Sequence, residues 1–175
     1  PDTRARRRES ITAGASAVFD RIGSADHVVV VSSAMVYGAW ENNPVPLTED
    51  AVLRPSNDFV YARQLAAVEQ LADEWRQEVP GRSVTVLRPV VPMAENGTSG
   101  LARALAFGMG RRFALDDPPA QFVHLDDLAS AVALAVERRL DGVFNVAPDG
   151  SIPAAQVRAL SGAAPRVKLP DRLGD

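Results

Sequence analysis

Four consecutive valines constrain the fold of this chain more than any other feature. They follow His27 and end at Val31, with no polar residue among them. A short apolar run of this kind is typical of a strand buried on both faces, as the strands of parallel sheets are. A strand with one solvent face would alternate apolar and polar residues instead. The segment His27–Val31 therefore predicts an inner strand of a parallel sheet.

Segments with helical spacing separate the predicted strands. Apolar residues recur at helical intervals over 5–22, where Gly23 is a stop signal. The expected elements that follow are a strand over 27–31, a helix over 58–78 that Pro80-Gly81 ends, and a second β-branched strand over 83–87. Alternation of helix and strand predicts a parallel sheet that is covered on both faces.

The second half of the chain has a different residue pattern. Glycines and prolines are frequent between 92 and 110, which predicts a looser excursion with one short helix over 99–107. A strand over 121–125 then leads into a helix that is expected to begin at an Asp126-Asp127 cap and end near Arg139. A strand over 143–146 and a helix that starts near Ser151 complete the prediction.

Composition excludes several classes of protein. Apolar residues make up 46% and charged residues 23%, the balance of a globular protein. The net charge of −3 argues against a nucleic-acid or membrane partner, and the one basic run (Arg4, Arg6, Arg7, Arg8) is interpreted as a solvated helix start rather than a phosphate-binding patch. There is no cysteine and there are only two histidines, so no metal site is expected. No apolar run spans a bilayer, and the cytoplasm is the expected location.

Hydroxyl-bearing residues follow the valine strand directly. Ser32 and Ser33 come after Val31, and Tyr37 comes shortly after them. In open α/β sheets, ligands bind beyond the carboxyl ends of parallel strands, so this segment stands where chemistry is expected. Both serines can equally serve to satisfy backbone groups at a strand end. On these residues alone, the two interpretations stay open.

Six motifs in order resemble the extended short-chain dehydrogenase/reductase family, of the NAD-dependent epimerase/dehydratase type. Each motif is weak alone, but together they cover nearly the whole chain. They are Ser-Ser-x-x-Val-Tyr-Gly at 32–38, Pro-Leu-Thr-Glu at 46–49, Tyr61 near a helix start, Arg88-Pro89 at a strand end, the Phe-Val-His-Leu-Asp-Asp segment at 122–127, and Phe-Asn-Val at 144–146.

The resemblance assigns roles to the matching positions. Ser33 would hydrogen-bond the reacting oxygen of a substrate, and Tyr61 would pass a proton to or from it while hydride moves to or from NAD or NADP. Ser32 and Tyr37, together with the Arg88-Pro89 turn, would line the cofactor or substrate pocket. His124 is expected to bond locally at a strand end. The resemblance further implies a small-molecule substrate and allows a homodimer.

One departure concerns catalysis. The family's Tyr-x-x-x-Lys motif requires lysine at 65, and this sequence has Leu65. Residues four apart share a helix face, which places the family's ammonium beside the phenol. A free phenol titrates near pH 10, so bringing it to neutrality requires about 4 kcal/mol of preferential phenolate stabilisation, which leucine does not supply. Gln64 is expected to replace the ribose contact, but it is uncharged.

Two further departures concern ligands. Sugar-nucleotide members place an arginine, which holds the diphosphate, where this chain has Ala120. The family's Gly-x-x-Gly-x-x-Gly loop is absent, and the family places it much further ahead of the Ser-Ser segment than the 31 residues that precede Ser32 here. We therefore expect that the pyrophosphate-binding half lies outside this chain and that the chain is a fragment.

These observations predict an α/β fold, the second half of a doubly wound Rossmann-type parallel sheet with a small substrate lobe. The sheet layer is expected over 1–91 and again over 121–148, the lobe over 92–120, and further lobe structure over 149–175. Three functions follow. One is an active oxidoreductase, epimerase or dehydratase that acts on a carbonyl or sugar-type compound without the usual lysine. The others are a catalytically impaired NAD(P)-binding sensor or regulatory subunit, and a fragment that binds no cofactor alone.

Overall fold

The computed structural model describes residues 10–94 and 119–160 and divides the chain into two compact units. The first comprises Pro1–Pro92 and Phe122–Asp149, and the second comprises Met93–Gln121 and Gly150–Asp175. The helix expected over 99–107 and the arginine cluster at 4–8 lie outside the described residues. The described elements are α2 (Ser10–Phe19), β1 (His27–Val31), η1 (Ala34–Tyr37), α3 (Val60–Glu78), β2 (Ser83–Pro89), β3 (Val91–Met93), β4 (Phe122–His124), α5 (Leu125–Arg138), β5 (Gly142–Val146) and α6 (Ala154–Leu160).

A three-stranded parallel sheet organises the first unit. Its strand order is β1-β2-β5, so the central strand is β2. β1 pairs with β2 from His27↔Ser83 to Val31↔Leu87, and β5 joins the other edge of β2. Six of the seven residues of β2 are buried, as expected for a strand paired on both sides. The parallel α/β prediction is confirmed.

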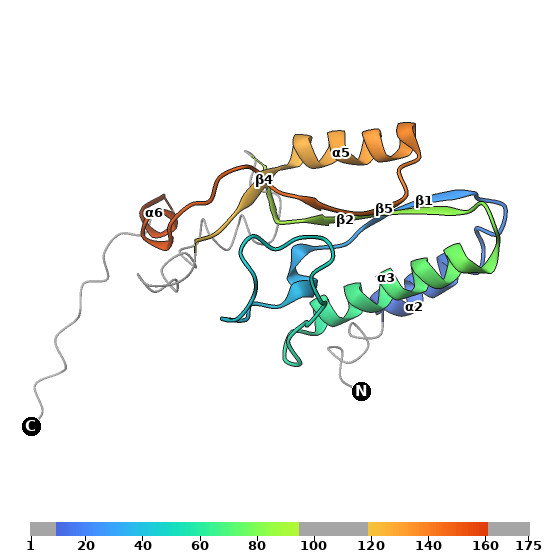
Figure 1. The fold of residues 1–175 in the computed structure, drawn as a ribbon, viewed down its shortest axis with the longest axis horizontal. Helices are drawn as coiled ribbons and strands as arrows, with labels where there is room; N and C mark the ends of the chain where they lie inside the picture. The colour runs from blue at the N-terminus through green and yellow to red at the C-terminus, as the bar shows by residue number, and fades with distance from the viewer. Residues whose placement is uncertain (1–9, 95–118, 161–175) are drawn as a thin grey trace, which may run out of the picture. The chain divides into compact units, whose positions relative to one another are not determined.

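Helices cover both faces of this sheet. Figure 1 shows α2 and α3 on one face and α5 on the other. The core between α3 and the sheet consists of Val30, Val68, Ala72, Trp75, Val84 and Val86. The Trp75 ring packs between Phe19, at 6.2 Å between ring centroids, and the guanidinium of Arg82, at 4.2 Å from the ring centroid. The predicted amphipathic helices thus bury their apolar sides against the valine strands.

Three local predictions need correction. β1 is less buried than its composition suggests, because in the described residues it pairs with β2 alone and its last residue, Val31, is 46% exposed. The segment 121–148 was expected to return to the main sheet, but in the described residues its first strand, β4, pairs with β3 in a separate two-stranded sheet. The cap of α5 is His124, whose Nδ1 accepts a hydrogen bond from the backbone N–H of Asp126 at 3.2 Å, while the two aspartates lie in the first helical turn. The local bonding expected of His124 is therefore confirmed.

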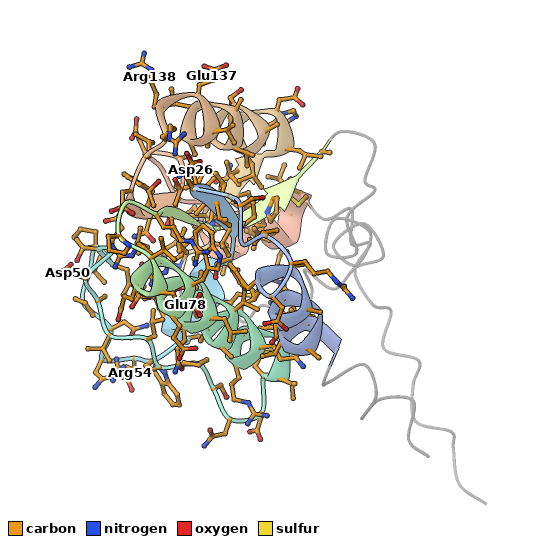
Figure 2. The ribbon with its side chains drawn as sticks, turned by 90° about the vertical axis from the view of Figure 1, so that its right-hand side faces the viewer. Asp26, Asp50, Arg54, Glu78, Glu137 and Arg138 are labelled. Atoms are coloured by element: carbon orange, nitrogen blue, oxygen red, sulfur yellow. The ribbon has the colours of Figure 1, made fainter. Side chains whose placement is uncertain are left out.

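A long loop joins η1 to α3 and passes the carboxyl ends of the strands. It begins at Gly38, which has φ 73° and therefore adopts a left-handed conformation that favours glycine. The Trp40 indole Nε1–H donates to the carbonyl of Arg54 at 2.6 Å, and the N–H of Arg54 donates to the carbonyl of Val36 at 3.1 Å. Asp50 and Arg54 lie on this loop, at the edge of the view in Figure 2. These bonds fold the loop back toward η1.

Candidate functional site

Ser32 and Ser33 stand at the carboxyl end of β1 in different environments. Ser32 is buried, its N–H donates to the carbonyl of Leu87 at 2.8 Å, and its hydroxyl donates to Oε1 of Glu69 at 2.5 Å. Ser33 is partly exposed, and its Oγ accepts the N–H of Met35 at 3.2 Å and so caps η1. Of the two hydroxyls, that of Ser33 is the one open to a ligand.

Tyr61 lies in the first turn of α3 and is also accessible. Its side chain is 46% exposed, and its ring stands at 6.1 Å from that of Phe59. One turn further along the helix, Leu65 is only 6% exposed. Gln64 is partly buried. At the position of the family's lysine, this chain therefore has a buried apolar side chain, Leu65. The exposed phenol of Tyr61 precedes it by one helical turn.

A buried ion pair lies behind the two serines. Glu69 of α3 is 7% exposed and Arg88 of β2 is 5% exposed. The Nη2 of Arg88 donates to Oε2 of Glu69 at 2.7 Å, and its Nε lies 3.2 Å from both carboxylate oxygens. Burial opposes the charge of Arg88, but hydrogen bonds to Glu69 and Tyr37 outweigh it and raise its pKa above the usual value. The guanidinium therefore stays charged.

Tyr37 extends this network to β5. Its phenol, in a side chain that is 1% exposed, accepts from Nη1 of Arg88 and donates to Oδ1 of Asn145, each at 2.7 Å. The Nη1 of Arg88 also donates to the carbonyl of Glu49 at 3.0 Å. The backbone N–H of Asn145 donates to the Glu49 carboxylate at 2.8 Å, and the side-chain amide of Asn145 donates to the carbonyl of Leu47 at 3.2 Å. The ends of all three parallel strands and the long loop are thus joined by one hydrogen-bonded cluster.

The structure brings the sequence-predicted residues together in two groups. Ser32, Tyr37 and Arg88 have their polar atoms bonded to protein partners in the buried cluster, and Pro89 is buried beside them. Ser33 and Tyr61 are accessible. Ser33 caps η1, Tyr61 belongs to α3, and η1 and α3 contact each other. Roles for all of these residues toward a cofactor stay predictions.

Two members of the cluster were missed as functional residues. Glu69 carried a readable signal, because a carboxylate four residues after Leu65 and next to Val68 stands on the apolar side of a predicted helix. Buried carboxylates require a partner, which the sequence alone did not supply. Asn145 stood within the Phe-Asn-Val motif, but nothing in the sequence indicated that it bonds Tyr37.

An open groove of about 620 Å³ lies between α3 and strands β2 and β5. Glu69 and Arg88 contribute to its wall, but neither Ser33 nor Tyr61 does. The residues that the structure describes contain no group of three or more acidic, histidine or cysteine side chains placed to hold a metal ion. Within the same residues, no helix is long and apolar enough to cross a membrane.

Solved structures of sugar-nucleotide enzymes share this fold. UDP-N-acetylglucosamine 4-epimerase from Methanobrevibacter ruminantium, in complex with UDP-N-acetylmuramic acid, has a TM-score of 0.73 at 20% identity, over 90% of this chain and 53% of its own. UDP-glucose 4-epimerase from Thermotoga maritima, with UDP-glucose, has a TM-score of 0.72 at 21% identity, over 90% and 53%. dTDP-glucose 4,6-dehydratase from Bacillus anthracis, in complex with NAD, has a TM-score of 0.72 at 14% identity, over 92% and 54%.

Sequence comparison identifies the family. An uncharacterized protein of Mycobacterium bovis is 26% identical over 149 residues, which are 85% of this chain and 40% of that protein, and one from Mycobacterium tuberculosis matches equally. The chain therefore spans less than half the length of these curated relatives. The family profile described as "NAD dependent epimerase/dehydratase family" matches residues 9–147. By this match, which covers most of its length, the chain belongs to the NAD-dependent epimerase/dehydratase family.

Proposed function

We propose that this chain carries the Ser/Tyr half of an NAD(P)-dependent epimerase, dehydratase or reductase that acts on a carbonyl or sugar-type small molecule. The observation that supports it is the placement of Ser33 and Tyr61. Both are accessible; Ser33, just after β1, caps η1, Tyr61 belongs to α3, and η1 and α3 contact each other. Ligands of open parallel sheets bind at such strand ends.

The described residues fit one part of a nicotinamide dinucleotide. Val31 and Ser33, at and just beyond the end of β1, and Tyr61, in the first turn of α3, would offer exposed apolar surface and hydroxyls to a flat ring and a reacting oxygen. The cofactor, whether NAD or NADP, would accept and return a hydride there. Donors for the pyrophosphate are not offered by the cluster, because Ser32, Tyr37 and Arg88 are bonded to protein groups. We therefore assign pyrophosphate binding to the part of the family fold that this chain does not span.

Within this proposal each residue has one task. The Ser33 hydroxyl donates a hydrogen bond to the substrate oxygen whose carbon loses or gains the hydride. The Tyr61 phenol passes a proton to or takes one from the same oxygen, as a positioned acid or base does. The long loop is held at the strand ends by hydrogen bonds from Arg88 and Asn145. Because Leu65 supplies no charge, Tyr61 acts with less assistance than in relatives that have lysine.

Turnover assays on the protein that contains both halves test the proposal. Suitable probes are UDP-glucose, UDP-N-acetylglucosamine and dTDP-glucose with NAD or NADP, read out as sugar products by chromatography. We expect turnover that Tyr61→Phe and Ser33→Ala each reduce by about 10²-fold or more, the usual size of a general acid–base contribution. Ser24→Ala, an exposed serine before β1, is the matched control and should behave as the parent. Turnover that survives both site variants would refute the assignment.

The burial of Leu65 favours a second candidate, a catalytically impaired NAD(P)-binding sensor or regulatory subunit. A dry leucine in place of the ammonium removes the group that lowers the phenol's proton affinity in the family. Calorimetry separates the candidates. Tight dinucleotide binding by the protein with both halves, without turnover of any probe, favours the sensor.

A further inference from the structure

Glu69 is a buried carboxylate on α3, the helix that also carries Tyr61. It follows Leu65 by one helical turn, and residues four apart lie on the same face of a helix. The side chain is 7% exposed. A charge in such a place is retained only with bonded partners, so the identity of those partners shows what the residue holds.

The partners of Glu69 lie on two neighbouring strands. Its Oε1 accepts the hydroxyl of Ser32 at the end of β1, and both of its oxygens accept donors of Arg88 near the end of β2. Ser32 is in turn fixed to β2 by its backbone N–H, which donates to the carbonyl of Leu87. Glu69 therefore ties α3 to the carboxyl ends of both strands at one point.

This tie joins the two segments that carry the accessible hydroxyls. Ser33 is the next residue after Ser32, and Tyr61 is on the helix that carries Glu69. A shift of α3 relative to β1 would move Tyr61 away from Ser33. We propose that Glu69 is a positioning residue that sets the placement of Ser33 relative to Tyr61, an inference that rests on the proposed function for the roles of those two residues.

The bonds of Glu69 fix the position of α3 relative to the strands more than they stabilise the fold. Buried ion pairs add little net stability compared with apolar residues of similar volume, because desolvation offsets the attraction between the charges. Their directional bonds nevertheless define one arrangement of the elements that they join. Displacement of a reacting group by about 1 Å lowers turnover by about 10²-fold, so a tie at this point has a large effect on chemistry.

A distance measurement tests the tie without any assay of turnover. The chain has no cysteine, so Met35→Cys with Tyr61→Cys gives two unique sites for spin labels, both exposed, on η1 and α3. We expect Glu69→Gln and Ser32→Ala to shift or broaden the label–label distance distribution. Glu74→Gln, which removes a charge from an exposed position of the same helix, should leave it unchanged. Ser32→Ala keeps the ion pair, so it serves as the second variant if Glu69→Gln does not fold. A folded Ser32→Ala protein with an unchanged distribution would overturn the proposal.

Kinetics of the protein with both halves separates this inference from the proposed function. We expect Ser32→Ala to lower kcat by about 10- to 100-fold with little change in the KM of the sugar nucleotide. On a Ser33→Ala background, the same substitution should have little further effect, because the Ser33 hydroxyl that is positioned relative to Tyr61 is already absent. A merely structural role would lower activity in both backgrounds. If Ser33→Ala and Tyr61→Phe leave turnover intact, the proposed function fails, whereas Ser32→Ala without effect in an otherwise sensitive enzyme defeats only the positioning role.

Discussion

Restoring the family's lysine at Leu65 should destabilise the fold substantially. Leu65 is 6% exposed, so its replacement removes a buried apolar side chain that contributes about 1.5–3 kcal/mol. The methylenes of lysine recover part of that term, but its ammonium enters a dry site without a prepared partner. Uncompensated burial of a charge adds a penalty of several kcal/mol, part of which the long side chain avoids by reaching toward solvent.

Glu69, one turn away, does not supply that partner. Its carboxylate already accepts the Ser32 hydroxyl and three contacts from Arg88, which fill the roughly four lone-pair sites of a carboxylate. An introduced ammonium would have to compete with Arg88 for the same oxygens. We therefore expect Leu65→Lys to lower the free energy of unfolding by about 3 kcal/mol, within the range of severe core substitutions. For a chain of this size, that corresponds to a fall in Tm of about 10 °C.

Urea unfolding of the chain at several pH values measures this effect. Burial depresses the pKa of an amine, so the folded state of the variant binds fewer protons than the unfolded state and its stability rises with pH. The deficit of Leu65→Lys should therefore shrink toward alkaline pH. Leu65→Met, similar in volume, should remain within about 1.5 kcal/mol of the parent, and Gln70→Lys, at an exposed position of α3, within about 0.5 kcal/mol. A Leu65→Lys protein as stable as Gln70→Lys at neutral pH would show that position 65 is not dry.

Three other substitutions test separate features. Gly38→Ala should lower the urea midpoint strongly, because a Cβ at φ 73° would lie 2.2 Å from a backbone oxygen. Gly81→Ala, at φ 92° with open space around it, is the control and should show only the smaller backbone strain. Equal effects of the two substitutions would contradict the close contact at Gly38. Tyr37→Phe should reduce stability by about 1–3 kcal/mol in the same assay, because two buried polar partners lose their bond; no loss would mean that water replaces the phenol. The hydrogen bond from Arg139 lowers the pKa of Asp26. The pair therefore stabilises the fold at pH values above the pKa of the Asp26 carboxyl in the unfolded chain. This contribution is lost as the pH falls through the pKa of the same carboxyl in the folded protein. In Arg139→Ala, an NMR titration should show the pKa of Asp26 returning toward its usual value, and an unchanged titration would refute the pairing.

The sequence predicted the parts of the fold that periodicity controls. The valine run and the apolar spacing of α3 identified β1, the long helix and the parallel sheet, because burial on two faces or on one helical side leaves a repeating pattern. The start of α5 was predicted wrongly, since several residue types near 124–127 can cap a helix and only the backbone geometry decides which one does. The pairing of β4 with β3 was beyond reach for a similar reason, because a short strand does not specify its partner.

The candidate site was predictable only in part. Ser33 and Tyr61 stood in recognisable motifs, and the structure leaves both accessible. The buried cluster was not foreseen, because hydrogen bonds between Glu69, Arg88, Tyr37 and Asn145 connect residues far apart in sequence. Residues that were expected to face a ligand, Ser32 and Arg88 among them, have protein partners that no local pattern could show.

The open side of β1 has a consequence for handling the chain in solution. Along β1 the described residues pair on one side only, with β2, and among those residues no strand covers the amide and carbonyl groups on the other side. Four valines in a row, without a charged or proline residue among them, form the kind of edge on which strands of separate molecules stack. We therefore expect concentration-dependent self-association of the isolated chain, visible by sedimentation and reduced by Val29→Lys, which places a charge on that strand.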